Sequence, residues 1–124
     1  MKPIHAPKAP AALGPYSAAI ATGPFIFCSG QTPIDPATGE LVPGGIAEQT
    51  EQVIRNLKAV LEAAGASMDH VVKTTCFLTD MGDFAAFNAV YAQHFTSKPA
   101  RSTVAVKALP KGAMVEVELI ATKE

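Results

Sequence analysis

The sequence predicts an α+β domain in which a β-sheet carries two helices on one of its faces. Segments rich in β-branched residues and segments with helical spacing of apolar residues follow one another in the order β-β-α-β-α-β-β, and turn residues separate them. Hydrophobic residues make up 48% of the sequence and charged residues 17%, which is enough apolar content for a packed core. We therefore expect residues 1–124 to form a single domain.

The N-terminal third of the chain predicts two strands and a long loop. Residues 3–15 are rich in proline and alanine and are expected to form an extended lead-in. Strands are expected over residues 17–22 and 25–31, because the Gly-Pro pair between them is typical of a turn. Residues 33–45 contain several glycines and prolines and are expected to form a loop.

Two helices are predicted in the middle of the chain. The apolar residues of the first recur at helical spacing, and Gly65 is suited to end it. These residues are Val53, Leu57, Val60, Leu61 and Ala64. A β-branched strand over residues 71–79 separates the two helices, and Asp80 or Asp83 can cap the second one. The apolar stripe of the second helix consists of Phe84, Phe87, Tyr91 and Phe95.

Two final strands are predicted over residues 101–109 and 114–122, with a Pro-Lys-Gly turn between them that favours a hairpin. The side chains of the last strand alternate between two faces. One face carries Val115, Val117, Leu119 and Ala121, and the other carries Met114, Glu116, Glu118 and Ile120. The first face suits packing against the helices, and the mixed second face indicates packing between copies of the chain.

The charge and the cysteines limit the function classes. The net charge is −1 and the basic residues are scattered, so no clustered basic segment predicts nucleic-acid binding. No apolar segment reaches the length of a membrane span, and residues 1–10 lack the apolar segment of a signal peptide. We therefore expect a cytoplasmic protein without membrane association. Cys28 and Cys76 lie in apolar strand segments and are expected to be reduced core residues.

The sequence lacks the patterns of metal, nucleotide and triad chemistry. His5, His70 and His94 are scattered without metal-ligand spacing, and there is no G-x-G-x-x-G, P-loop or G-x-S-x-G pattern. We therefore expect neither a metal nor a cofactor.

A few polar residues lie in unusual places. Arg101 opens a strand, Glu116 and Glu118 interrupt an otherwise apolar strand, Asn88 borders the stripe of the second helix, and Tyr16 follows a Gly-Pro pair. From the residues alone, each also fits an ordinary structural role. The arginine fits a strand-end charge, the glutamates a solvated face, the asparagine a helix surface and the tyrosine the core.

Several segments together resemble the Rid family of reactive intermediate deaminases, also called YjgF-type proteins. The resemblance covers residues 9–122 and rests on several short motifs. They include Gly-Pro-Tyr-Ser at 14–17, Cys-Ser-Gly-Gln at 28–31, Asn-Leu-Lys at 56–58, Val-Lys-Thr-Thr at 72–75, the stretch 83–88, Pro-Ala-Arg-Ser at 99–102, Leu-Pro-Lys-Gly at 109–112 and Val-Glu-Val-Glu at 115–118. The resemblance implies a fold like that of trimeric bacterial chorismate mutase, a homotrimer with clefts between subunits, and hydrolysis of 2-iminobutanoate and 2-iminopropanoate to 2-oxo acids and ammonia.

The resemblance also implies a set of site residues. The carboxylate-binding arginine of the family matches Arg101, and the other site residues match Tyr16, Ser29, Asn88 and Glu116, with Gly30 beside them. Many relatives carry cysteine two positions after the arginine, where this chain has Thr103. A catalytic thiol is thereby excluded at that position. A contact through the backbone carbonyl is preserved, so Thr103 stays among the expected substrate-binding residues.

The residue types fit the implied chemistry. A guanidinium binds a carboxylate through two parallel hydrogen bonds, and this fixes the C=N carbon next to that carboxylate. A partly buried carboxylate has a raised pKa and can accept a proton from water near neutral pH. We therefore expect Arg101 to hold the substrate and Glu116 to activate the water.

The expected hairpin separates these two residues. In a regular hairpin Glu116 faces about Lys107, and Arg101 lies roughly 20 Å further along at about 3.3 Å per residue. We therefore expect that a cleft containing both residues takes them from neighbouring copies of the chain.

Three other functions remain open at this point. The chain fits a non-catalytic ligand-binding or chaperone-like trimer, and it fits a deaminase of a larger enamine such as 2-aminomuconate. Some relatives are credited with RNA cleavage in translation inhibition, which the charge balance does not support. The presence of Arg101 favours the deaminase over the non-catalytic function.

Overall fold

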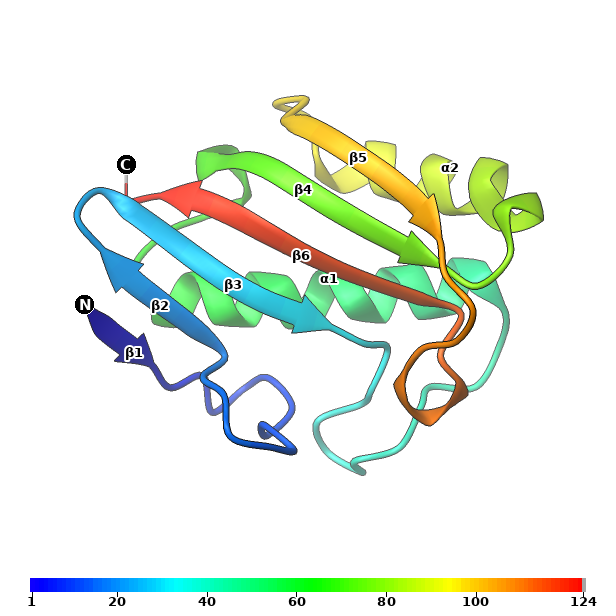
Figure 1. The fold of residues 1–124 in the computed structure, drawn as a ribbon, viewed down its shortest axis with the longest axis horizontal. Coiled ribbons are helices and arrows are strands. Elements are labelled where there is room, and N and C mark those ends of the chain that lie inside the picture. The colour runs from blue at the N-terminus through cyan, green and yellow to red at the C-terminus, as the bar shows by residue number, and fades with distance from the viewer. Residues whose placement is uncertain (124) are drawn as a thin grey trace.

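The computed structural model describes residues 1–123, which form one six-stranded sheet and two α-helices (Figure 1). The strands are β1 (Lys2–Ile4), β2 (Ala19–Thr22), β3 (Phe25–Gln31), β4 (Val71–Leu78), β5 (Ala100–Ala105) and β6 (Val115–Thr122). The helices are α1 (Ile46–Ala63) and α2 (Phe84–His94), with short 3-10 helices η1 (Met68–His70), η2 (Met81–Asp83) and η3 (Pro110–Gly112). None of the described helices has the length and apolar composition that a membrane span requires.

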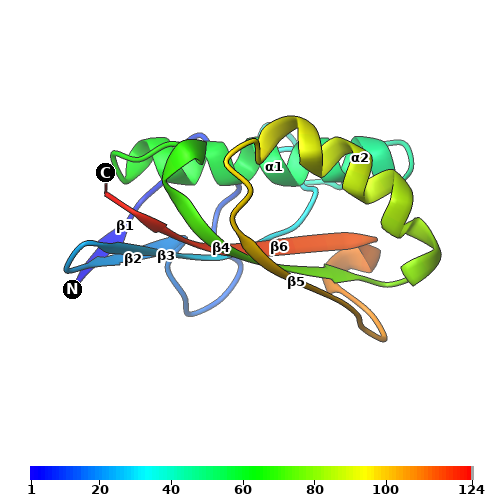
Figure 2. The ribbon, with the colours of Figure 1, turned by 90° about the horizontal axis from the view of Figure 1, so that it is seen from above.

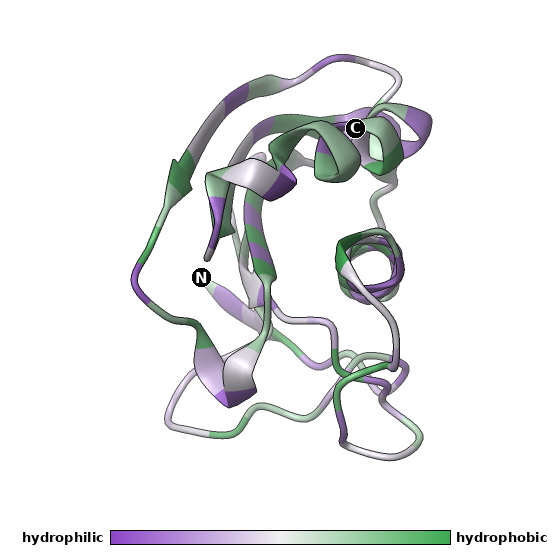
Figure 3. Cartoon of the chain, turned by 90° about the vertical axis from the view of Figure 1, so that its right-hand side faces the viewer, coloured by the Kyte–Doolittle hydropathy of each residue, from purple (hydrophilic) through white to green (hydrophobic). Residues whose placement is uncertain are grey.

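Both helices pack on one face of the sheet, which confirms the predicted fold class (Figure 2). In Figure 3, α1 is seen nearly end-on beside the sheet, and hydrophilic and hydrophobic residues alternate along the strands. The space between the layers is filled by apolar side chains that are fully buried, including Ile26, Leu57, Phe87, Val117 and Leu78. Cys28 and Cys76 are buried free thiols of this core, as predicted. The other face of the sheet is open, and Phe25, Phe27 and Val104 are more than two-fifths exposed there.

The strands are arranged in the order β1-β2-β3-β6-β4-β5. Only β4 and β5 pair in parallel, while every other neighbouring pair is antiparallel. The last strand, β6, therefore lies inside the sheet between β3 and β4, and its alternating residues are buried on the helix side, as predicted.

The predicted hairpin between the last two strands is wrong. The strand expected over residues 101–109 ends at Ala105 and is a parallel neighbour of β4 rather than a partner of β6. From β5 the chain passes over the end of β4, where the Val106 amide donates to the Leu78 carbonyl at 2.8 Å. The reason lies in burial: β6 has one fully apolar face and suits the interior of the sheet, whereas most of β5 is exposed and suits its edge.

The N-terminal part differs from the prediction in two places. Residues 2–4 form the edge strand β1 rather than an unpaired lead-in, because they pair with residues 19–21 of β2. Helix α1 begins at Ile46, earlier than its apolar spacing indicates. The Glu48 side chain accepts a hydrogen bond from the Gly45 amide at 2.8 Å, which caps the additional first turn.

Buried polar residues of α1 connect it to the chain segments that surround the sheet. The Asn56 side chain is 1% exposed, and its amide nitrogen donates to the carbonyls of Thr32 at 3.0 Å and Ile34 at 2.9 Å. About two turns earlier along the helix, the Gln49 side chain accepts a hydrogen bond from the Met114 amide at 2.8 Å. These contacts fix the backbone that follows β3 and the backbone that enters β6.

Replacing Asn56 by leucine is expected to destabilise the fold by about 2–4 kcal/mol, because two buried backbone carbonyls lose their donor. Urea denaturation of the variant and of the original chain measures this difference in the free energy of unfolding. Arg55→Ala is the control at the neighbouring exposed position, with an expected change of about 0.5 kcal/mol or less. Equal stabilities of N56L and R55A would contradict a structural role for the buried amide.

Candidate active site

The residues expected to form the site lie on opposite faces of the sheet. Arg101 is paired with Thr74 of β4, and Thr74 is paired with Leu119 of β6, so these three side chains point to the helix-covered face. Glu116 is paired with Phe77 and points to the open face. Arg101 and Glu116 are therefore separated by the sheet, which lies between their side chains, and not by distance along a hairpin.

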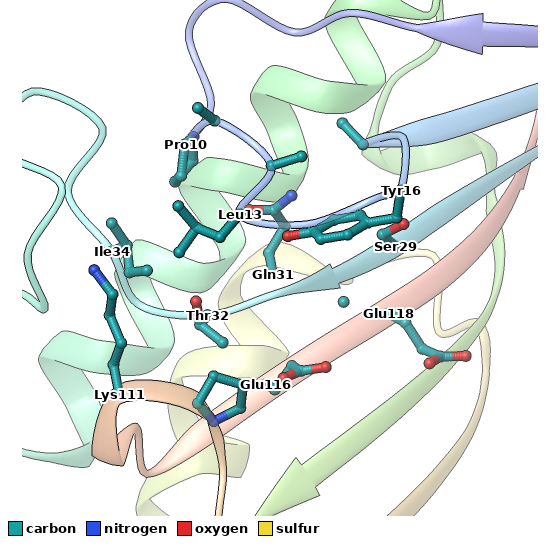
Figure 4. Close-up of a pocket in the computed structure, with 15 residues that line it drawn as sticks. Pro10, Leu13, Tyr16, Ser29, Gln31, Thr32, Ile34, Lys111, Glu116 and Glu118 are labelled. Atoms are coloured by element: carbon teal, nitrogen blue, oxygen red, sulfur yellow. The ribbon is translucent and has the colours of Figure 1, made fainter.

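The first group of predicted residues surrounds a cleft of about 610 Å³ that includes part of the open face (Figure 4). Tyr16, Ser29, Gly30 and Glu116 line it, as a shared site requires. The N-terminal loop, the end of β3, the η3 turn and β6 supply its walls. Figure 4 shows Ile34 and Lys111 at one end of the cleft and Ser29 and Glu118 toward the other.

An irregularity in β3 places Ser29 and Gly30 at this cleft. The pairing of β3 with β6 shifts register between Cys28 and Gln31, which is the signature of a β-bulge. The Ser29 hydroxyl donates to the Ser17 carbonyl at 2.7 Å. Its proton therefore holds the segment next to Tyr16, and its lone pairs remain available to accept a hydrogen bond from a ligand.

Gly30 gives the Glu116 carboxylate the space it occupies. A Cβ atom at position 30 would overlap Oε2 of Glu116 and would lie 2.8 Å from its Cδ. Any other residue at this position would push the carboxylate away from β3. The glycine thus has a steric role toward Glu116 in addition to its place beside the cleft.

The electrostatics of Glu116 differ from those of a solvated glutamate. Partial burial raises the pKa of the Glu116 carboxyl above its ordinary value, and the neighbouring charge of Glu118 raises it further. Glu118 is two residues along β6, on the same face, and is exposed. A carboxylate with a raised pKa is a better proton acceptor at neutral pH than an ordinary one.

The second group of predicted residues lines a separate cleft of about 620 Å³ between α2 and β5. Arg101 donates from Nη1 to the Asn88 side-chain oxygen at 2.6 Å. Its Cζ atom lies 4.7 Å from the centroid of the Tyr91 ring and 5.4 Å from that of Phe84. Arg101 and Asn88 are thus brought together, and the half-buried Arg101 has its guanidinium against aromatic rings.

Thr103 belongs to neither cleft. It is paired with Cys76 of β4, and its hydroxyl oxygen is buried without a hydrogen-bond partner in the part of the chain that the structure describes. Its side chain faces the same way as Arg101, two residues earlier on β5.

Sequence reasoning missed several residues of both clefts. In the first, the missed residues include Leu13, Thr32 and Ile34. They come from loops, and no local pattern indicates that these loops meet. At the second, Tyr91 lines the cleft and Phe84 contacts Arg101 beside it, and both were expected only as core residues. Their spacing from Asn88, one turn on each side, was the signal that they share its face. Residues 1–123 contain no group of three His, Cys, Asp or Glu side chains arranged to hold a metal ion.

The chain is similar to known proteins over nearly its whole length. The family model described as Endoribonuclease L-PSP matches residues 6–123. A RutC family protein from Pyrococcus abyssi is 57% identical, with 98% of this chain and 96% of the relative covered. A 2-iminobutanoate/2-iminopropanoate deaminase from Bos taurus is 50% identical, with 98% and 90% covered. The crystal structure of E. coli TdcF with bound serine matches all of both chains, at a TM-score of 0.95 and 41% identity.

Replacing Glu118 by glutamine is expected to lower the pKa of Glu116, because ionising Glu116 then no longer creates a repulsion between like charges. Burial still acts on the carboxyl group, so the pKa stays above the value of an exposed glutamate. Carboxyl-carbon NMR titration measures the shift directly, and Glu62→Gln on the exposed surface of α1 is the control. An unchanged pKa in E118Q would show that Glu118 has no influence on Glu116.

Proposed function

Because the chain belongs to the Endoribonuclease L-PSP family, also known as the Rid or YjgF family, and has its chorismate mutase-like fold, we propose that it hydrolyses 2-imino acids to 2-oxo acids and ammonia. The proposed substrates are 2-iminobutanoate and 2-iminopropanoate, which the name of the Bos taurus relative specifies for that protein. The observation that carries the proposal is an arginine held in a cleft by an asparagine, together with a glutamate of raised pKa.

Arg101 binds the substrate carboxylate in this proposal. One edge of its guanidinium is already oriented by Asn88, and the remaining N–H groups are available as a fork for a carboxylate. Binding at that fork fixes the adjacent C=N carbon, so that much of the entropy lost in orienting the substrate for attack is lost on binding rather than in the chemical step. The E. coli TdcF structure contains serine, which also has a carboxylate beside a nitrogen-bearing carbon, and this supports a small ligand of that kind.

Glu116 activates the attacking water. Its carboxylate accepts a proton from water as the water oxygen bonds to the C=N carbon of the protonated imine, and the product of this addition is a neutral carbinolamine. Glu116 then returns that proton to the nitrogen. As the C–N bond breaks, the hydroxyl group of the carbinolamine gives its proton to the Glu116 carboxylate, so that ammonia and a 2-oxo acid leave. Tyr16, Ser29 and Gly30 surround Glu116 in the cleft, while Asn88 and Thr103 accompany Arg101.

Two copies of the chain are needed to bring these roles together. The side chains of Arg101 and Glu116 point to opposite faces of one sheet, so one substrate contacts both only if they come from different subunits. The proposal therefore includes an assembly with one cleft at each subunit boundary, and a homotrimer is the assembly that the family resemblance implies. The apolar residues exposed on the open face, among them Phe25, Phe27 and Val104, support contact between copies there.

The charges that line the two clefts suit one small carboxylate at Arg101 rather than an RNA backbone along both clefts. The cleft around Glu116 is lined by two glutamates and one lysine, and an RNA backbone would meet repulsion there. The family description refers to a ribonuclease, but only two basic side chains, Lys98 and Arg101, line the second cleft, and Lys111 is the one basic side chain along the first within the described residues. A deaminase of small imino acids is the function that this charge distribution favours.

The proposal is tested in a coupled assay. Threonine dehydratase generates 2-iminobutanoate, semicarbazide traps it, and the protein is expected to increase 2-oxobutanoate release at the expense of the trapped product. Arg101→Ala is expected to lower kcat/KM by about 100-fold or more, because charge-assisted bonds to the carboxylate are lost. Arg55→Ala, an exposed arginine of α1, is the control and should retain full activity. Absence of acceleration by the original chain would overturn the proposal.

The shared site makes a separate prediction about mixed oligomers. R101A and E116Q are each expected to be inactive, but unfolding them together and refolding the mixture should restore roughly one quarter of the original activity, because a random cyclic oligomer forms intact clefts at that frequency. Refolding each variant by itself is the control. If the mixture stays as inactive as the separate variants, both residues act within one subunit or one of them has no catalytic role.

A further inference from the structure

We propose that Tyr91 is a positioning residue that holds Arg101 in the orientation that binds a carboxylate. Tyr91 and Phe84 present their rings to the guanidinium from one side of α2, and we call this pair the aromatic shelf. The inference rests on the proposed function for its catalytic consequence. The placement of the guanidinium on the shelf can be tested separately.

The spacing along α2 creates the shelf. Phe84, Asn88 and Tyr91 are separated by four and then three residues, so they lie on the same side of the helix. All three contact Arg101: Asn88 accepts a hydrogen bond at 2.6 Å, and the two rings lie 4.7 and 5.4 Å from its Cζ. Asn88 alone fixes one nitrogen and leaves the plane of the guanidinium free to rotate, whereas contact with ring faces restricts that plane as well.

Tyr91 is itself held from two directions. Its hydroxyl is 2.7 Å from the hydroxyl of Thr74, a fully buried residue of β4. Directly after the end of α2, the ring of Phe95 stacks on Tyr91 with a centroid distance of 4.2 Å and an interplanar angle of 22°. The tyrosine is 7% exposed, so its position is set by the core and not by solvent.

Thr74, Tyr91 and Arg101 contact one another in a closed set that connects β4, α2 and β5. Thr74 is the ladder partner of Arg101 across β4 and β5, it bonds Tyr91 through its side chain, and Tyr91 contacts the Arg101 guanidinium. Thr74 therefore fixes the backbone of Arg101 directly and its guanidinium indirectly, through Tyr91. A side chain that is ordered before binding loses less conformational entropy when the substrate arrives, which strengthens binding.

The inference predicts a specific kinetic effect. Tyr91→Leu removes the closer of the two ring contacts with the guanidinium. This variant is expected to raise KM for 2-iminobutanoate by about 5- to 30-fold, which corresponds to the loss of a partly desolvated cation–π contact. Its kcat is expected to stay within about twofold of the original value. Phe84→Leu, at a half-buried position that is easier to change, is expected to raise KM by a smaller factor. F84L also provides the test of the inference if Y91L does not fold.

Phe87→Leu is the matched control. Phe87 is a fully buried ring on α2, between Phe84 and Tyr91 in sequence, and contacts both rings rather than the guanidinium. This variant is expected to lower the melting temperature while leaving KM unchanged. If F87L raised KM as much as Y91L or F84L at equal loss of stability, the effect would be structural and the inference would be overturned.

A second measurement does not depend on catalysis. A ring face shields a proton above it, so the Arg101 Nε–H proton is expected to resonate upfield in the NMR spectrum of the free protein, identified by its loss in R101A. The upfield shift should disappear in Y91L and remain in F87L. An unchanged resonance in Y91L would overturn the inference even if the protein is a deaminase, whereas the expected shift without any deaminase activity would reject only the proposed function.

Discussion

The pleat of β6 determines where the candidate active site lies. Val115, Val117, Leu119 and Ala121 must point to one side, because that side meets α1 and α2 and forms the core. The residues between them then have to point to the opposite side, and this places Glu116 and Glu118 together on the open face. A shift of β6 by one residue would bury both carboxylates under the helices, so the stability of the core and the position of the proton acceptor depend on the same register.

The sequence predicted the elements better than their arrangement. Alternation in β6 and helical spacing in α1 and α2 are local properties, and the structure confirms them. The Pro-Lys-Gly turn before β6 was misleading, since a short turn between two strand-like segments favours a hairpin only when no third strand takes the place between them. Here β4 separates β5 from β6. This strand order depends on the burial of side chains across the whole sheet, which no local pattern contains.

For the candidate site, too, the sequence indicated individual residues better than their arrangement. The family motifs assigned Arg101, Asn88, Glu116 and Gly30 to one site. In one chain Arg101 contacts Asn88 and Gly30 makes room for Glu116, but the two pairs lie at separate clefts. The aromatic shelf was not predicted, because Tyr91 looks like any buried aromatic residue until β5 is known to lie beside α2. The sequence also gave no sign of the steric dependence of Glu116 on Gly30, which arises from a bulge in one strand and a side chain on the next.

The two clefts differ in how they are built, and this difference has a consequence for evolution. The two ionised groups that would perform the chemistry are on β5 and β6, whose register is fixed by pairing with β4. The rest of the wall around Glu116 comes mostly from segments outside the strands, at residues 10–16, 32–34 and 110–111. Loops tolerate substitution and changes in length that strands do not. Divergent members of such a family can therefore acquire new substrate preferences through these loops while inheriting an unchanged pair of reacting groups.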